Sequence, residues 1–201
     1  MVTALVILVG YLAGSVPTGY WIVRAWRGVD IRTVGSGNIG ASNVWRVFGR
    51  RYGVPVVLLD VAKGFGPALV GTLLVGDLTG VLAGGAAMLG HWRPLFLRFE
   101  KGGKTVATAG GAFLGVAPIV GGIGATIWIA TFLLFRYASL ASILAACSLP
   151  ILSALLGEPW PVIVFGALAA LAVVLLHRAN IARLRAGTER RFRFGREAPA
   201  R

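Results

Sequence analysis

Residues 105–135 read TVATAGGAFLGVAPIVGGIGATIWIATFLLF, and how often this uncharged stretch crosses a membrane decides the fold. A helix needs about 20 apolar residues to cross the hydrocarbon core of a bilayer. The stretch is therefore long for one crossing and short for two. The choice depends on which side of the membrane holds the next basic residue, Arg136.

The composition of the whole chain indicates a membrane protein. Of its 201 residues, 57% are hydrophobic and only 13% are charged, whereas a soluble domain carries about 25% charged residues. The net charge of +13 could indicate nucleic-acid binding. However, the basic residues lie between long apolar runs, a pattern typical of membrane topology. We predict one membrane-embedded domain over residues 1–201 and no nucleic-acid partner.

The distribution of basic residues predicts the number of crossings. Other apolar runs suited to helices lie at 2–23, 53–75, 79–97, 138–156 and 160–177. Cytoplasmic loops carry an excess of Lys and Arg. Arg136 joins the basic loops and the basic tail (183–201) on one side only if residues 105–135 cross twice, turning near Pro118 or Gly121. This predicts an all-α protein of seven transmembrane helices, with an external N-terminus and a cytoplasmic C-terminus.

The first basic loop has the composition of an anion site. It contains GSGNIGASN at 35–43, followed by Arg46. The glycines permit positive φ angles and a nest of free backbone amides, and an arginine can hold a phosphate through two hydrogen bonds. The side-chain donors here are Ser36, Asn38, Ser42 and Asn43. The spacing of Gly35, Gly37 and Gly40 also matches a dinucleotide fingerprint, but that motif needs a βαβ unit, which membrane spans exclude.

The second basic loop, HWRPLFLRFEKGGKTVAT at 91–108, offers a second anion site. Its end resembles a P-loop, but Arg98 stands where the first glycine would be. We expect Gly102 and Gly103 to leave free amides at the start of a helix near Thr105. There the helix dipole, Lys104 and the hydroxyl of Thr108 would favour an anion.

Three further groups of polar residues stand out near or within the apolar runs. Ser139 and Ser142 share a helix face, although such hydroxyls often bond only their own backbone. His177 and Asn180 share a face at the inner end of the last span, and Asp60 and Lys63 have the spacing of an internal ion pair. With a single cysteine and no paired carboxylates, we expect no metal and no cofactor. An enzyme built from these groups would position phosphates and stabilise developing charge.

Three segments resemble the signatures of the bacterial acyl-phosphate:glycerol-3-phosphate acyltransferase family, PlsY. They are GSGNIGASNVWR at 35–46, GGKTVAT at 102–108 and HRANIARL at 177–184. The resemblance implies transfer of a fatty acyl group from acyl-phosphate to the 1-hydroxyl of glycerol-3-phosphate, in phospholipid biosynthesis. The products are lysophosphatidic acid and phosphate. It also implies a seven-helix protein of the bacterial inner membrane, surrounded by membrane lipid, with its site facing the cytoplasm.

By motif position, the resemblance implies that Ser36, Arg46, Lys104, His177 and Asn180 are catalytic, the last four mainly by gripping glycerol-3-phosphate. The loop with Ser36 and Asn38 would hold the acyl-phosphate head, and a groove between helices would take the acyl chain. Residues expected to bind substrate or phosphate are Gly35, Gly37, Asn38, Gly40, Ser42, Asn43, Gly102, Gly103, Thr108 and Ser142. The chain departs from the family pattern at Ser42 (commonly Thr), at Thr105 (usually Gly) and at Glu100–Lys101, where one residue is typical.

Two other classes of function compete with the enzyme. A transporter for a small phosphate compound also fits charged residues within spans, but we find no inverted repeat and no basic residues in the external loops. A structural scaffold leaves the Gly/Ser/Asn-rich loop unexplained.

Overall fold

The structure is a computed structural model that describes residues 1–192; residues 193–201 of the predicted basic tail lie outside the described part. Within residues 1–192 every regular element is a helix, which confirms the predicted all-α class. The elements are α1 (Val2–Gly14), α2 (Thr18–Arg27), η1 (Ile31–Thr33), α3 (Ala41–Phe48), α4 (Arg50–Leu74), α5 (Asp77–Trp92), η2 (Leu95–Leu97), α6 (Val106–Val116), α7 (Pro118–Phe135), α8 (Ala138–Leu155), α9 (Trp160–Leu176) and α10 (Arg178–Arg185).

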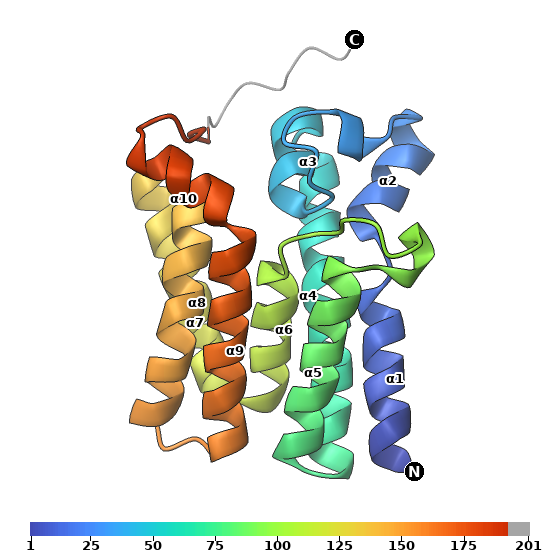
Figure 1. Ribbon diagram of the computed structural model, residues 1–201, viewed down its shortest axis with the longest axis vertical. Helices are drawn as coiled ribbons and strands as arrows, with labels where there is room; N and C mark the ends of the chain where they lie inside the picture. Colours follow the sequence, from blue (N-terminus) through green and yellow to red (C-terminus); the bar gives the residue numbers. More distant parts are fainter. Residues whose placement is uncertain (193–201) are drawn as a thin grey trace.

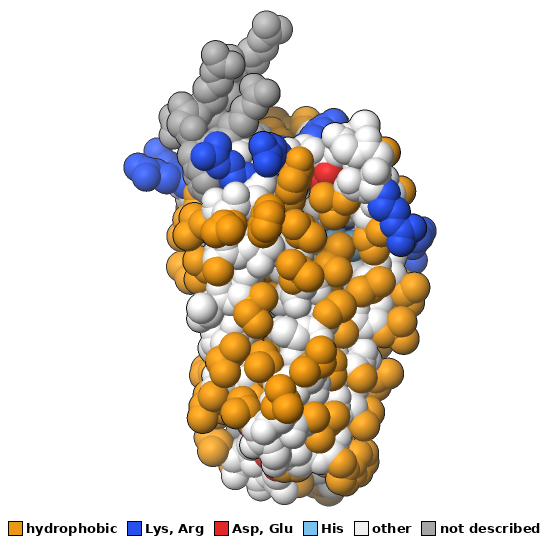
Figure 2. Space-filling model, turned by 90° about the vertical axis from the view of Figure 1, so that its left-hand side faces the viewer, with side chains coloured by type: hydrophobic (Ala, Val, Ile, Leu, Met, Phe, Trp, Pro, Cys, Tyr) orange, Lys and Arg blue, Asp and Glu red, His pale blue; other side chains and the backbone are white. Residues whose placement is uncertain are grey.

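The long helices run between two ends of an elongated bundle (Figure 1). The N-terminus lies at one end, where the hydroxyls of Thr3 and Thr79 are 3.5 Å apart. The first residue of α5, Asp77, and Pro159 in the α8–α9 connection line a hollow at this same end, together with Thr3. Helices α3 and α10 lie at the other end (Figure 1). Figure 2 shows Lys and Arg side chains gathered at this second end, above a surface dominated by hydrophobic side chains.

Residues 105–135 form two helices, as predicted. Helix α6 ends at Val116 and α7 begins at Pro118. Proline suits the first position of a helix because its φ angle is already helical and the amide it lacks would have no partner in the first turn. The two helices are unequal, with 11 and 18 residues. After α7, the carbonyl of Arg136 accepts a 2.7 Å hydrogen bond from the amide of Phe192. Arg136 therefore lies at the basic end of the bundle.

Helix length alone supports fewer crossings than seven. Among the described residues, four segments are long and apolar enough to span a membrane: residues 2–27, α4, α7 and α8. The pair α9 and α10, bent by 63°, could form a fifth. Helices α5 and α6 have only 16 and 11 residues, so the count of seven stays a prediction.

The first apolar run is broken, where we expected one helix over residues 2–23. Helix α1 ends at Gly14 and α2 begins at Thr18, because Pro17 has no amide to continue the ladder. A break inside a membrane leaves backbone groups that need partners. The Nζ of Lys63 donates to the carbonyl of Val16 at 3.0 Å. Lys63 thus stabilises the break, and it also forms the predicted ion pair with Asp60, at 2.8 Å.

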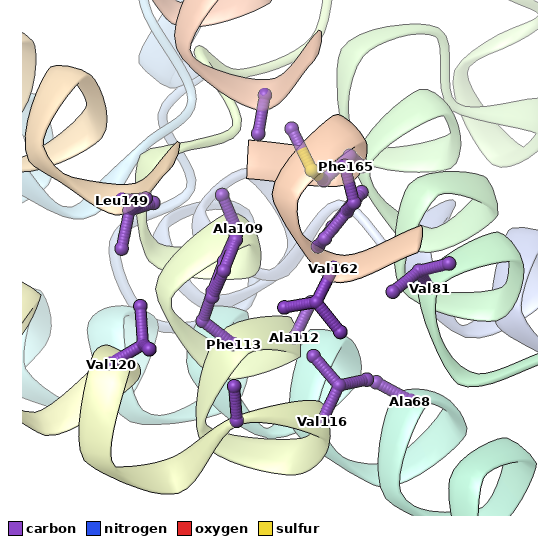
Figure 3. Packing of buried hydrophobic residues seen from close by; sticks show 13 residues of the cluster. Ala68, Val81, Ala109, Ala112, Phe113, Val116, Val120, Leu149, Val162 and Phe165 are labelled. Carbon is purple, nitrogen blue, oxygen red and sulfur yellow. The ribbon is translucent and has the colours of Figure 1, made fainter. Parts of the chain in front are cut away.

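The main core lies where α4 to α9 meet, and Figure 3 shows its side chains. The rings of Phe113 and Phe165 stack there with centroids 5.1 Å apart. Glycine lets α6 approach α4 closely: a Cβ on Gly64 would lie 2.0 Å from the carbonyl oxygen of Thr108. This contact places the first turn of α6, and with it Lys104, against the middle of α4.

Candidate active site

Asn43 organises the glycine-rich loop. Its Oδ1 accepts a hydrogen bond from the Ser36 amide at 2.9 Å, and its Nδ2 donates to the Asn38 carbonyl at 2.9 Å. Gly35 and Gly37 adopt φ angles of +64° and +68°, and a Cβ on Gly35 would lie 2.3 Å from Asn43 Oδ1. The Asn43 side chain, which is 2% exposed, therefore holds the loop in shape from inside.

Two glycine amides of this loop are bonded already. The Gly37 amide donates to the Val34 carbonyl at 3.0 Å, and the Gly40 amide donates to Asn38 Oδ1 at 2.8 Å. The amides of Gly37 and Gly40 are therefore not free for an anion, and the anion-binding role of the loop stays a prediction. Gly40 instead precedes α3, whose start has no side-chain cap. The first amides of α3 are thus open to an anion, beside the exposed side chain of Ser42.

Helix α3 also carries Arg46, which is a partly buried cation. Its guanidinium carbon lies 5.5 Å from the centroid of the Phe192 ring, and its Nε is buried without a hydrogen-bond partner among the described residues. Burial lowers the pKa of the Arg46 guanidinium, although the charge of Glu189 partly offsets this; arginine nevertheless stays protonated. A buried donor without a partner is costly. An anion bound here would relieve that cost.

The second loop is closed against the end of α5. The Gly102 amide donates to the Trp92 carbonyl and the Gly103 amide to the His91 carbonyl, both at 2.9 Å. The expectation that these two amides are free for an anion is therefore wrong. Glycine is needed here for close approach, since a Cβ on Gly103 would lie 1.9 Å from His91 Nε2. The loop thus fixes the position of Lys104, the next residue.

The start of α6 is open to an anion. Thr105 precedes the helix with a φ of +63°, and its side chain does not cap the first turn. This left-handed backbone explains why glycine is usual at this position in the resembling family. The hydroxyls of Thr105 and Thr108 are buried without hydrogen-bond partners among residues 1–192. The segment after Lys104 therefore offers the uncapped amides of the first turn of α6 and the unpaired hydroxyls of Thr105 and Thr108.

A polar cluster joins Lys104 to the last helix. Lys104 Nζ donates to Asn180 Oδ1, and Asn180 Nδ2 donates to Glu189 Oε1 at 2.6 Å. Glu189 also accepts hydrogen bonds from Ser139 Oγ and Arg183 Nε, each at 2.7 Å. Because Glu189 can only accept when ionised, it orients the Asn180 amide with its oxygen toward Lys104.

The charges of this cluster favour an anionic ligand. Burial lowers the pKa of Lys104 to about 8; Glu189 acts in the opposite direction, and Arg183 and Arg46 add to the lowering. Burial also raises the pKa of Glu189, but hydrogen bonds from Asn180 and other donors outweigh it and leave that pKa below its usual value. Three cations thus surround one carboxylate, and a phosphate would balance them.

The structure gives His177 and Ser142 different environments. His177 Nδ1 lies 2.8 Å from the Val173 carbonyl, so Nδ1 carries the hydrogen and Nε2 is left as a hydrogen-bond acceptor. Ser142 Oγ donates to the Ala138 carbonyl at 2.7 Å and accepts from Trp128 Nε1 at 3.2 Å. This is the backbone-bonded alternative considered for Ser142. Its role in substrate binding stays a prediction.

Residues near the C-terminus contact the first and third motif segments. The Phe192 ring packs edge-on against Trp45, with centroids 5.7 Å apart, and lies 5.2 Å from Phe132. Neither Glu189 nor Phe192 was among the residues expected at the site. Glu189 could have been noticed as one of only two acids, with Glu197, in the basic tail 183–201, whereas no sequence pattern marks Phe192. The side chain of Ser36 is exposed, and its catalytic role stays a prediction.

Comparisons with known proteins point to one family. A sequence profile described as glycerol-3-phosphate acyltransferase matches residues 4–187. Glycerol-3-phosphate acyltransferases from Desulforudis audaxviator and Geotalea daltonii are 48% and 46% identical, over 94% and 96% of this chain and 96% and 100% of theirs. A crystal structure of PlsY (YgiH), an integral membrane glycerol 3-phosphate acyltransferase in its glycerol 3-phosphate form, has a TM-score of 0.90 at 40% identity, over 96% of both chains. Its lysophosphatidic acid form has a TM-score of 0.88.

Proposed function

The chain belongs to the glycerol-3-phosphate acyltransferase family, and from this premise we propose that its acyl donor is acyl-phosphate. The reaction would transfer the acyl group to the 1-hydroxyl of glycerol-3-phosphate and yield lysophosphatidic acid and phosphate. The observation that carries the proposal is the cationic cluster of Arg46, Lys104 and Arg183. The uncapped start of α6 follows Lys104 directly, and Arg46 belongs to α3, whose start is also uncapped. Two phosphate-bearing substrates need two such anion sites.

Glycerol-3-phosphate would bind at the cluster around Lys104. The related PlsY has been solved in a glycerol 3-phosphate form, which supports this acceptor. Lys104 Nζ and the buried Arg46 guanidinium supply positive charge, while His177 Nε2 and the Asn180 amide supply directional hydrogen bonds. The acyl-phosphate head would bind at the start of α3, near Ser36 and Asn38.

The chemistry would rely on positioning and charge. The 1-hydroxyl oxygen attacks the acyl carbonyl carbon, a C–O ester bond forms, and the bond from that carbon to the phosphate oxygen breaks. The hydroxyl proton passes to a phosphate oxygen of the substrate, so no protein base is required. Lys104 and the amides at the start of α6 stabilise the negative charge that develops on the carbonyl oxygen.

The same proposal covers the membrane arrangement. Residues 1–201 would form one domain with seven crossings, the N-terminus outside and the C-terminus in the cytoplasm of a bacterial inner membrane. Arg136 and α10 share the basic end of the bundle, and the N-terminus shares the other end with Asp77 and Pro159. Basic segments remain in the cytoplasm. The site would therefore face the cytoplasm, where both substrates are available.

The donor can be tested directly with purified protein in detergent. Palmitoyl-phosphate or palmitoyl-CoA is supplied with glycerol-3-phosphate, and both phosphate release and lysophosphatidic acid are measured. We expect product only with acyl-phosphate, in equal amounts with phosphate. Product from the thioester donor alone would refute the proposed donor.

A matched pair of variants tests the site. Lys104→Met removes the clustered cation, and we expect turnover to fall about 100-fold or more. Lys101→Met removes an exposed lysine three residues earlier and should leave turnover within a few-fold of wild type. Wild-type turnover in folded Lys104→Met would contradict the role assigned to Lys104.

A further inference from the structure

Asp60 is a buried carboxylate that the proposed reaction does not use. It lies on α4 and is 1% exposed. Its Oδ1 accepts a 2.6 Å hydrogen bond from Thr18 Oγ1 and lies 2.8 Å from Lys63 Nζ. His91 Nδ1 lies 3.7 Å from the same oxygen. One carboxylate oxygen therefore faces side chains from α2, α4 and α5.

One side of this cluster leads to the glycine-rich loop. Thr18 begins α2, and the next residue, Gly19, packs directly against that loop. A Cβ on Gly19 would lie 1.9 Å from the carbonyl oxygen of Ile39 and 3.3 Å from Val44. Because no side chain separates the two backbones, a shift of Thr18 must move the loop that precedes α3.

The other side leads to the lysine loop. The His91 carbonyl accepts the Gly103 amide at 2.9 Å, and the His91 ring fills the space in which a Gly103 side chain would lie. His91 Nδ1 is buried without a hydrogen-bond partner among the described residues. Lys104 follows Gly103, so the position of the His91 ring relative to Asp60 affects the position of Lys104.

We propose that Asp60 is a positioning residue that sets the spacing between the two anion-binding loops. It acts on the glycine-rich loop through Thr18 and on Lys104 through His91, and it contacts neither substrate. The inference rests on the proposed function, because that function gives both loops a substrate. The competing explanation is an ion pair that only neutralises Lys63. Buried ion pairs contribute little to stability relative to apolar residues of similar size. An ion pair without a positioning role therefore predicts unchanged loop spacing and kinetics when both charges are removed, whereas a positioning role predicts that both change.

The test uses two variants that leave no uncompensated buried charge. Asp60→Leu combined with Lys63→Leu removes both charges together, and with them the hydrogen bond from Lys63 to the Val16 carbonyl. Thr18→Val removes one hydroxyl but keeps the ion pair and the Lys63–Val16 hydrogen bond, so it separates the effect of Asp60 from that of Lys63. The matched control is Thr72→Val on α4, the helix that holds Asp60. It removes a buried hydroxyl that has no hydrogen-bond partner in the described structure.

Two readouts separate positioning from stability. Spin labels on cysteines at the exposed positions Thr33 and Lys101, one beside each loop, report the distance between the loops, with Cys147→Ala as background. Phosphate release gives KM for glycerol-3-phosphate and kcat separately. Small misplacements of reacting groups cost about 100-fold in rate, so we expect the double variant to lose about tenfold or more in kcat/KM. Its label distances should broaden or shift.

The outcomes are distinguishable. We expect Thr18→Val to change distances and kinetics in the same direction, and Thr72→Val to behave as wild type. Asp60→Asn with Lys63→Met, which keeps an oxygen for Thr18, should recover part of the loss. Wild-type distances and kinetics in the folded double variant, or in Thr18→Val if the double variant does not fold, would overturn the proposal. If wild type fails to use acyl-phosphate, the proposed function fails, but the label distances still test the role of Asp60.

Discussion

Raising the pH through about 8 should remove the positive charge of Lys104. Burial lowers the pKa of this amine to about 8 in the free protein, and the charged form exists below that pKa. About 90% of Lys104 is then charged at pH 7 and about 10% at pH 9. If charged Lys104 is required to bind glycerol-3-phosphate, kcat/KM should fall about tenfold between these two values and continue to fall above them.

The assay measures kcat/KM for glycerol-3-phosphate from pH 6 to 10, with enzyme-free blanks at each pH to subtract hydrolysis of the acyl-phosphate. Lys104→Arg is the control, because a guanidinium stays charged throughout this range. We expect this variant to be less active than wild type, and its kcat/KM should not fall near pH 8. If Lys104→Arg is inactive, we measure glycerol-3-phosphate binding to Lys104→Met over the same pH range instead. Its affinity should not change near pH 8. A wild-type profile that is flat to pH 10, or the same fall in the variants, would refute the assignment.

Three further substitutions test the geometry of the site. Gly103→Ala should reduce kcat/KM about tenfold or more, because its Cβ would displace the His91 ring, whereas Gly110→Ala meets nothing within 4 Å and should be neutral. Glu189→Ala should destabilise the protein by about 1–3 kcal/mol in thermal unfolding, since Asn180 and Arg183 lose their shared partner; Glu158→Ala, at the other end of the bundle, should have a smaller effect. Thr105→Gly should stabilise the protein by up to about 1 kcal/mol, because the left-handed backbone costs a β-branched residue more than glycine loses in entropy; a lower melting temperature would contradict this.

The helices and the break at Pro118 could be predicted from the sequence because their causes are local. Runs of apolar residues, a proline without an amide and clusters of Arg and Lys each act over one or two helical turns. The same locality explains the failure at residues 15–17, where Pro17 was read as part of a continuous helix. The helix can break before Thr18 because Lys63, which is distant in sequence, donates a hydrogen bond to the Val16 carbonyl.

The site could be predicted only as a set of residue types. Lys104, Asn180 and Arg46 were expected, and the structure brings Lys104 and Asn180 into contact. The expectation of free amides failed at Gly37 and Gly103, because each amide finds a carbonyl in its own loop or in α5. Hydrogen-bond partners of this kind depend on how loops pack, and no residue pattern reports them.

By itself, the sequence determined that this chain is a helical membrane protein and which residues it offers to phosphates, because hydropathy and charge are properties of each segment. Only the tertiary structure decided that the amides of Gly37, Gly102 and Gly103 are bonded within the protein. It alone showed that Glu189 orients Asn180 and that Asp60 lies behind both loops. These are contacts between segments far apart in the chain, and they exist only once the helices have packed.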